Sequence, residues 1–247
     1  MSIPFYGHAT AAVFAPLESM SRSDLVARRL TDAIALGLLP DGEQLPGELD
    51  LAGLFRVSTV TIREALSSLR HQGLIVTRRG RGGGSFVRAT RDVAVGLASE
   101  RLASLSLVDV RDLGDVYAAV AGSCAALAAR RSSPEDVDRL RRVAGQLASA
   151  PDAGARRRAD AHFSIEVAVA AQSPRLYREE VDLQAEVGTL LWLALGDDDS
   201  HAEVVTSSQA LVEAVAGRDA EAARSAAESR VADATVRLID FKLNQEA

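Results

Sequence analysis

The stretch 57–87 constrains the fold most, because it joins a short amphipathic helix to an arginine-rich ribbon. Ser58 is a favoured N-cap residue, since its hydroxyl can accept from a backbone N–H two or three residues later. Apolar side chains then recur at the helical spacing i, i+3, i+4, i+7; they are Ile62, Ala65, Leu66 and Leu69. Gly73 stands where helices commonly end. The pattern predicts a short helix with one buried face and one polar face.

The residues after this helix predict two short strands with a basic tip between them. Residues 74–77 and 85–87 are rich in β-branched and aromatic side chains, and residues 78–84 read RRGRGGG. No Gly-Lys-Ser or Gly-Lys-Thr follows the glycines, which excludes a nucleotide-binding loop. An arginine run alone is usually a solvated face. Helix, glycine stop and basic ribbon in this order instead favour a winged helix-turn-helix, whose helix reads the major groove while its wing approaches the phosphates.

The charge distribution supports DNA binding by the first part of the chain only. The 247 residues carry a net charge of −6. Residues 1–90 hold ten arginines and eight acidic residues, whereas residues 91–247 hold eighteen basic and twenty-six acidic residues. Six arginines and no carboxylate lie between Glu64 and Asp92. A weakly basic region followed by an acidic one indicates that a single segment contacts nucleic acid.

The sequence also indicates an intracellular protein. The sole cysteine, Cys124, cannot form an intrachain disulfide, and its alanine-rich helical surroundings favour buried packing over a reactive thiol. No lysine or arginine precedes Arg22, and no apolar run reaches the length of a membrane span. We therefore expect no signal peptide, no membrane segment and a cytoplasmic location.

The chain divides into a tail, a winged helix-turn-helix and a helical domain. Residues 1–20, with two prolines and no hydrophobic period, are predicted to be a flexible tail. In the winged domain, residues 21–90, the first helix begins at Ser21 or Ser23 and ends at Gly37. Its inner face is predicted to comprise Val26, Leu30, Ile34 and Leu38. Residues 91–247 are predicted to be all-α, with helices at about 92–104, 108–131, 134–149, 154–172, 174–195, 200–216 and 219–243. The expected fold class is mainly α with one small β-ribbon.

Residues 22–88 resemble the DNA-binding domain of the GntR family of bacterial transcription regulators. The segment LPGE at 45–48 matches the family's Leu-Pro-Ser-Glu motif, and VSTVTIREAL at 57–66 matches its Val-Ser-Arg-x-x-Val-Arg-Glu-Ala-Leu motif. The resemblance implies DNA contacts from the recognition helix and the wing, with Arg63 matching a contact of the family. The predicted contacts are Ser58, Thr59, Val60, Thr61, Arg63 and Ser67 on the helix and Arg78, Arg79, Arg81 and Gly82 on the wing.

Two residues depart from the family's pattern. Members often carry arginine after the glutamate of the second helix and at the second position of the recognition helix, where this chain has Leu49 and Thr59. Arginine reads guanine O6 and N7 bidentately, so direct guanine readout is lost at these points. Thr59 and Val60 are suited to contact a thymine methyl group. We hypothesise an operator that differs from the family's common one at those bases; a guanine strictly required opposite Thr59 would contradict this.

The helical domain resembles the FCD effector-binding domain of the FadR subfamily, most clearly at 160–176 and 214–230. Many members hold a divalent metal there with one aspartate and three histidines. The alignment keeps Asp160 and puts other residues at the three histidine positions, namely Ser164, Ser208 and Arg230. The histidines of this domain, His162 and His201, lie elsewhere, and His162 is on a different helix face from Asp160. We therefore predict no metal and no cofactor.

Without a metal, Asp160 needs another partner. Arg230 can pair bidentately with a carboxylate inside a helical bundle, which would fill the metal's space together with Ser164 and Ser208. Two alternatives remain open: Arg230 binds an anionic effector directly, or both side chains point to solvent. Tyr117 and Trp192, at helical spacing among leucines and alanines, are interpreted as core residues.

Together these features predict a sequence-specific DNA-binding transcription regulator and no enzyme, because no metal triad or nucleophile–base motif is found. The resemblance implies a homodimer, joined through the helical domains, on a short inverted repeat in double-stranded DNA. A small-molecule effector, for which an anion is one candidate, would bind at Asp160, Ser164, Ser208 and Arg230. A repressor is favoured, although the sequence does not separate repression from activation. The alternative is a helical domain that only dimerises and senses no ligand.

Overall fold

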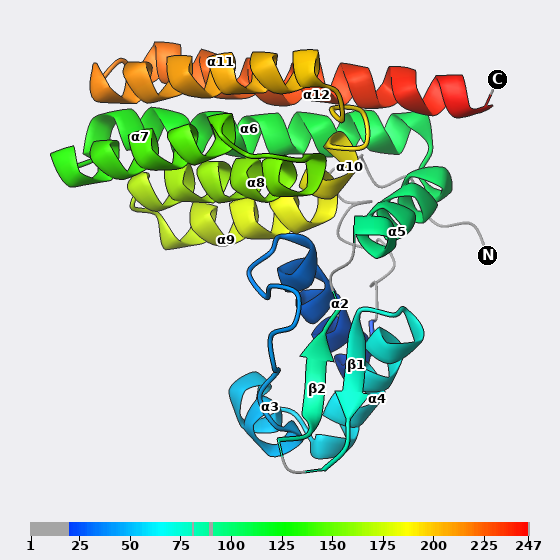
Figure 1. Ribbon diagram of the computed structural model, residues 1–247. Helices are drawn as coiled ribbons and strands as arrows, with labels where there is room; N and C mark the ends of the chain where they lie inside the picture. The colour runs from blue at the N-terminus through cyan, green and yellow to red at the C-terminus, as the bar shows by residue number, and fades with distance from the viewer. Residues whose placement is uncertain (1–19, 81, 89–90, 247) are drawn as a thin grey trace, which may run out of the picture.

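In the described part of the chain, a head of three helices and a two-stranded ribbon lies below a larger helical body (Figure 1). The computed structural model describes residues 20–80, 82–88 and 91–246, and only the backbone of residues 91–94 and 246. We call residues 20–88 the head and residues 91–246 the body. The predicted tail, apart from Met20, lies outside the described residues. None of the described helices is both long and apolar enough to span a membrane. The predicted fold class, mainly α with one small ribbon, is confirmed.

The head helices pack around one apolar core. Helix α2 spans Arg22–Ala35, α3 spans Glu48–Phe55 and α4 spans Thr59–His71. The predicted apolar stripe of the recognition helix is buried in full, together with residues of α2 and α3: Val26, Leu30, Ile34, Leu51, Ile62, Ala65, Leu66 and Leu69. Leu38 was expected on the same face but is 55% exposed. The reason is that α2 ends at Ala35 and Gly37 turns the chain with a φ of 74°.

The ribbon is a short antiparallel wing beside the helices. Strand β1 spans Ile75–Arg78 and β2 spans Gly84–Val87, with Ile75 paired with Val87. The segment that leads into α3 runs along the outer side of β2, because the backbone N–H of Leu45 donates to the Ser85 carbonyl at 2.9 Å. The N–H of Val87 donates in turn to the Glu43 carbonyl at 2.8 Å. These bonds fasten the base of the wing to the start of α3.

Two long helices run side by side through the body: α6, Leu107–Arg131, and α12, Ala220–Glu246 (Figure 1). Gly114 allows their close approach, because a Cβ there would lie 2.5 Å from the side chain of Thr235. The other regular helices are α5, Arg91–Ser104; α7, Pro134–Ala148; α8, Ala153–Ala170; α9, Pro174–Leu183; and α11, Asp198–Ala216. The bounds of the helices in this last group agree with the predicted ranges to within two residues, except that α9 covers only the first part of the predicted helix 174–195.

That predicted helix is interrupted. Helix α9 ends at Leu183 and is followed by a π-helical segment, η1, Gln184–Gly188, and by the short α10, Thr189–Leu191. A π-helical turn widens the helix and is frequent at functional sites. Gly188 suits the wider turn, because a Cβ there would collide with the side-chain oxygen of Gln184. Hydrophobic spacing alone did not distinguish this segment from a regular helix.

The C-terminal end of α2 rests on α8 and η1 of the body. The Arg157 guanidinium of α8 donates to the carbonyl of Ala35, where a positive charge stabilises the end of a helix. Arg28 of α2 lies 3.4 Å from Glu186 of η1. An apolar cluster beside these contacts comprises Leu36, Ala161 and Ala185. The π-helical segment is therefore part of the junction between the head and the body.

Candidate functional site

The outer face of α4 carries the predicted DNA-reading side chains. Ser58 caps the helix by accepting from the Thr61 backbone N–H at 3.1 Å, and its hydroxyl also lies 2.9 Å from the Thr61 hydroxyl. Val60 is 58% exposed, whereas Thr59 and Ser67 are half-buried. The side chain of Thr61 thus supports the cap, which leaves Thr59 and Val60 for the predicted contact with a DNA groove.

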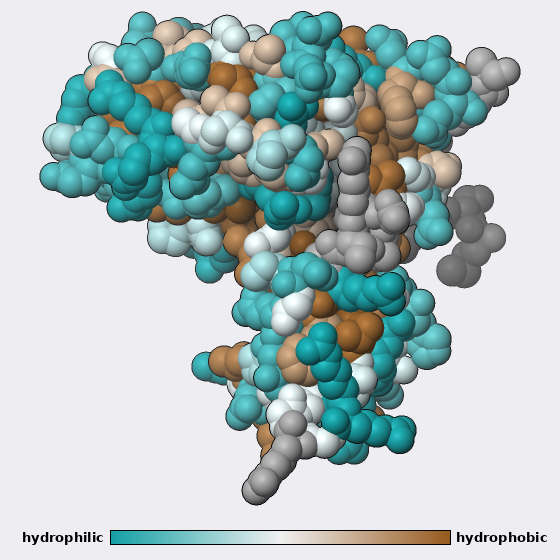
Figure 2. Space-filling view, in the orientation of Figure 1, coloured by the Kyte–Doolittle hydropathy of each residue, from teal (hydrophilic) through white to brown (hydrophobic). Residues whose placement is uncertain are grey.

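Arg63 stands on the same helix and is held by an acidic partner. Its Nε donates to Oε2 of Glu48 at 2.6 Å, and the Arg63 side chain is 66% exposed. Most of the guanidinium is therefore accessible to solvent, and Glu48 orients it. Glu48 belongs to the Leu45–Glu48 segment, so the two matched motifs meet in space. Leu49, where the family often has arginine, is 78% exposed; Figure 2 shows hydrophobic surface on the head.

The wing presents its arginines at the far end of the head from the body. The Arg78 guanidinium carbon lies 4.4 Å from the centre of the Phe86 ring, which holds that side chain over the sheet. Arg79 is exposed, and Gly82 has a φ of 79° that favours glycine. Gly83 is packed so tightly that a Cβ would lie 2.5 Å from the Arg78 carbonyl oxygen. Arg81 lies outside the described residues.

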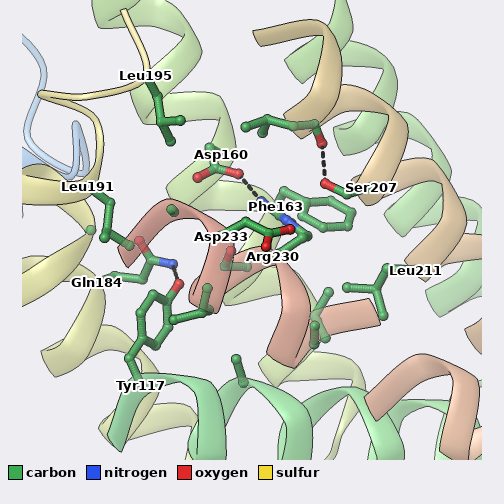
Figure 3. Close-up of a pocket in the computed structure, with 18 of the residues that line it drawn as sticks. Tyr117, Asp160, Phe163, Gln184, Leu191, Leu195, Ser207, Leu211, Arg230 and Asp233 are labelled. Atoms are coloured by element: carbon green, nitrogen blue, oxygen red, sulfur yellow. Dashed lines mark hydrogen bonds and ion pairs between the residues drawn. The ribbon is translucent and has the colours of Figure 1, made fainter. Parts of the chain in front are cut away.

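A cavity of about 110 Å³ lies inside the body, and α6, α8, α9, η1, α11 and α12 contribute to its wall. Three of the four predicted effector residues line it: Asp160, Ser164 and Arg230. The prediction of Ser208 is corrected, because its hydroxyl donates to the Val204 carbonyl at 2.7 Å and its side chain is fully buried outside the cavity wall. Its neighbour Ser207 lines the cavity instead (Figure 3). Helix α11 presents Ser207 to the cavity and turns Ser208 away from it.

Asp160 and Arg230 form an ion pair across the cavity wall (Figure 3). Nη2 of Arg230 donates to Oδ1 of Asp160, while Oδ2 accepts from Nε1 of Trp192 at 2.9 Å. The guanidinium carbon also lies 5.2 Å from the centre of the Phe163 ring. The pair is mostly buried, with side-chain exposures of 16% and 12%. The predicted pair is therefore present, and the alternative in which both side chains point to solvent is wrong.

The cavity does not fit the metal that many relatives of this fold hold. A guanidinium occupies one oxygen of Asp160, and a fixed positive charge at that place repels a dication. His162 is half-exposed and lies 3.5 Å from Glu166, and His201 bonds to the Leu147 carbonyl at 2.9 Å. Among the residues that the structure describes, no group of three metal-ligating side chains is found. The donor set here is that of an ion pair.

A second polar group in the cavity wall was not predicted. The Glu180 side chain is buried, with 1% exposure, and its Oε1 accepts from Nε2 of Gln184 at 3.2 Å. Gln184 also donates to the hydroxyl of Tyr117. Burial raises the pKa of Glu180 to about 7, a rise that hydrogen bonds and the charge of Arg230 partly oppose. Burial likewise raises the pKa of Tyr117 well above its usual value.

The sequence held a signal for this group. Glu180 and Gln184 follow Leu176 by four and eight residues, so both stand on the apolar stripe of the helix predicted at 174–195, where charged and amide side chains are rarely left without a role. Tyr117 and Trp192 were interpreted as core residues. Both are buried, but Tyr117 lines the cavity and Trp192 binds Asp160. Cys124 is buried as predicted, and burial raises its pKa to about 12.

Comparison with known proteins places these two sites in a known pair of domains. Residues 22–84 match the bacterial regulatory proteins of the gntR family, and residues 112–233 match the FCD domain. RmpR of Mycobacterium gastri, named an HTH-type transcriptional regulator, is 39% identical over 233 residues, which cover 94% of this chain and 85% of RmpR. The chain belongs to the GntR family. It is a DNA-binding transcription regulator with an FCD domain, and the family is one of regulators and not of enzymes.

Two further similarities delimit the shared parts. A fructoselysine utilization operon transcriptional repressor of Escherichia coli K12 is 39% identical over 66 residues, 27% of this chain and 26% of that protein. The solved structure of Escherichia coli McbR/YncC has a TM-score of 0.54 at 16% identity and covers 93% of this chain and all of that one. The second likeness confirms the fold. The FCD match includes Asp160, Glu180 and Arg230, so the cavity belongs to the FCD domain.

Proposed function

We propose that this GntR regulator binds an operator through its head and that a small molecule in the body cavity changes its operator affinity. One observation carries the proposal: the π-helical segment lines the cavity and also contacts the head. Gln184 and Gly188 of η1 belong to the cavity wall. Between them in sequence, Glu186 pairs with Arg28 of α2 at 3.4 Å and with Arg101 of α5 at 2.6 Å. A ligand that shifts η1 therefore acts on the head through direct contacts.

The head reads DNA by its two exposed elements. Helix α4 enters the major groove, where Thr59, Val60 and Arg63 contact base edges. Arg78, Arg79 and Arg81 of the wing contact phosphates, supported by Gly82, and supply salt-dependent affinity. Ser58 and Ser67 lie beside these residues and face the sugar-phosphate backbone of the DNA. The charge of this region, with six arginines and no carboxylate between Glu64 and Asp92, supports this assignment.

The operator is proposed to be a short inverted repeat bound by a homodimer. The proposal of a dimer joined through the body follows the resemblance to the FadR subfamily, and exposed apolar side chains on the two long body helices are available for such an interface. They are Val108, Val116, Val236 and Leu243. A repressor role is supported by the Escherichia coli protein that is similar to 66 residues of this chain and is named a transcriptional repressor. A regulator bound to the bacterial chromosome works in the cytoplasm.

The ligand acts by differential affinity for two arrangements of the head, since a ligand that binds both equally shifts nothing. The rival function, a body that only dimerises, leaves the cavity without purpose. The cavity wall holds the buried Glu180 and the mostly buried pair of Asp160 and Arg230, which a dimerisation module does not need. These groups favour the sensor.

The test is operator binding with and without ligand. Operators are selected from random DNA, and the affinity of the full chain is measured by fluorescence anisotropy against a metabolite library. We expect at least one metabolite to change the affinity about five-fold or more. That change is expected to be lost in Arg230→Ala and kept in Arg224→Ala, a matched control whose side chain pairs with Glu228 on the surface of the same helix. A library without effect, or equal responses of the two variants, would contradict the sensor and favour the dimeriser.

A further inference from the structure

The most unusual group in the cavity is a carboxyl oxygen without a partner. Oε2 of Glu180 is buried and, among the described residues, has no hydrogen-bond partner. Oε1 is bonded to Gln184, so the side chain is held in one orientation while Oε2 stays free. Leaving a buried carboxylate oxygen unpaired costs free energy, and leucine at this position of the α9 stripe would avoid that cost. A bound group that donates to Oε2 would explain why an acid stands here.

The charges of the cavity wall identify the kind of donor. The lining contains four acids, Asp160, Glu180, Glu203 and Asp233, and two arginines. Both arginines are already paired with acids, Arg230 with Asp160 and Arg237 with Glu203. Within the described residues, no arginine or lysine forms an ion pair with Glu180, and the nearest positive charge, Arg230, is already paired with Asp160.

We propose that the cavity binds a small ligand with a protonated amine, and that this amine donates to Oε2 of Glu180. The inference rests on the proposed function in one respect, that this cavity is the effector site. An ammonium group satisfies the free oxygen and also neutralises the buried carboxylate, whereas a hydroxyl group supplies only the hydrogen bond. The alternative of a bound metal ion is not supported, since Glu180 has no second and third ligating side chain beside it in the described structure.

The opposite part of the cavity suits an acidic end of the same ligand. Among described residues, Arg230 donates only through Nη2 to Asp160, which leaves its other N–H groups available. Ser207 also lines the cavity (Figure 3), and because its hydroxyl donates to the Val204 carbonyl at 3.0 Å it offers an acceptor to a ligand. Ser164 lines the cavity as well. The volume of about 110 Å³ is smaller than the cavity of about 150 Å³ that holds benzene, so it holds roughly six non-hydrogen atoms at most. The expected ligand class is a small amino acid-like zwitterion.

Trp192, the sole tryptophan, provides a reporter for binding because its indole bonds to Asp160 in the cavity wall. The full chain is titrated with three matched series, each of about two or three carbons to suit the cavity volume: ω-amino carboxylates, ω-hydroxy carboxylates and unsubstituted carboxylates. Simple n-alkylamines complete the set. We expect one amino member to bind at least about tenfold more tightly than its hydroxy and unsubstituted analogues, because only the amino series carries a positive charge that can meet Glu180.

Two variants of α9 test the role of Glu180. In Glu180→Gln the preference for the amine is expected to fall by about tenfold or more, while circular dichroism remains that of the parent. Glu179→Gln removes the same charge from an exposed neighbour on the same helix and is expected to keep the preference. Equal affinities of amine and analogues, equal behaviour of the two variants, or no binding of any amine each overturn the proposal.

The outcome is separable from that of the proposed function. If a ligand without an amine shifts operator affinity through the cavity, the sensor function stands and the amine proposal fails. If an amine binds at Glu180 and leaves operator affinity unchanged, the amine site stands and the regulatory role fails.

Discussion

The head and the body bury different kinds of side chain. The core of the head consists of apolar residues, and its arginines are exposed. Every buried polar or charged residue of the described chain lies in the body, among them Glu180, Gln184 and Lys242. An apolar core holds one packing and presents a fixed surface to DNA. Buried charges make a structure sensitive to whatever satisfies them. This difference supports the proposal that the head is a rigid reader of DNA and that the body responds to a ligand.

The largest expected effect is on the buried ion pair of the body. Arg230→Ala leaves Asp160 buried without a counter-charge, so we expect a loss of about 3 kcal/mol in the free energy of unfolding. Arg224→Ala removes a surface pair from the same helix and is expected to cost under about 1 kcal/mol. Chemical denaturation of both variants measures the difference. If Asp160→Asn fails to restore stability to Arg230→Ala, the pair is not the cause.

A pH-dependent effect is expected at Glu180. Its pKa of about 7 in the folded state exceeds the usual 4.5, so the folded protein binds more protons between these values and loses stability as pH rises through that window. The difference between the two pKa values corresponds to a loss of about 3 kcal/mol in the free energy of unfolding at pH values above about 7. Glu180→Gln is expected to raise Tm most above about pH 7 and to remove this slope. The titratable groups that face Glu180 are Tyr117, Asp160, Arg230 and Cys124. Thermal unfolding of both proteins at a series of pH values from about 4 to 8 provides the measurement.

The head is expected to lose function without losing stability. Arg63→Ala removes an exposed ion pair and the proposed base contact, so operator affinity should fall by about tenfold to a hundredfold while Tm changes little. Arg29→Ala, an exposed arginine of α2, is the control of equal charge. A comparable loss of operator affinity in the two variants would mean that Arg63 contributes only positive charge and no contact with a specific base. A large drop in Tm for Arg63→Ala would break the contrast between reader and sensor.

The smallest effect is expected at the junction of the two regions. Glu186→Ala removes the pairs with Arg28 and Arg101, so the change in operator affinity caused by ligand should shrink by about 1 kcal/mol. Operator affinity without ligand should remain near that of the parent. Glu179→Ala, an exposed acid on the adjoining helix, is the control. An unchanged ligand response in Glu186→Ala would show that coupling takes another route, for which the contact of Arg157 with Ala35 is the next candidate.

Local patterns in the sequence were enough to predict the elements. Apolar spacing, the cap at Ser58 and the stop at Gly73 determine α4, and each acts within a few residues, so no tertiary information is needed. The arginine-rich tip and the pairing of Asp160 with Arg230 were also predictable, the second because the resemblance brought together two residues far apart in sequence. Hydrophobic spacing did not predict the exposure of Leu38 or the π-helical turn, because each depends on where a helix ends or widens against its neighbours. The resemblance pointed to Ser208, and only the packing of α11 in the folded body shows that Ser207 faces the cavity.

What the sequence determined by itself is a winged reader followed by a helical domain, since short-range spacing and charge specify both. What only the tertiary structure decided is the chemistry of the cavity. Whether Glu180 is a solvated acid or a buried one depends on which helices cover α9, and those helices come from remote parts of the chain. The same applies to Glu186, whose partners lie on α2 and α5. Burial and ion pairing are set by distances in space, and for this reason the evidence for the proposed sensing function comes only from the folded molecule.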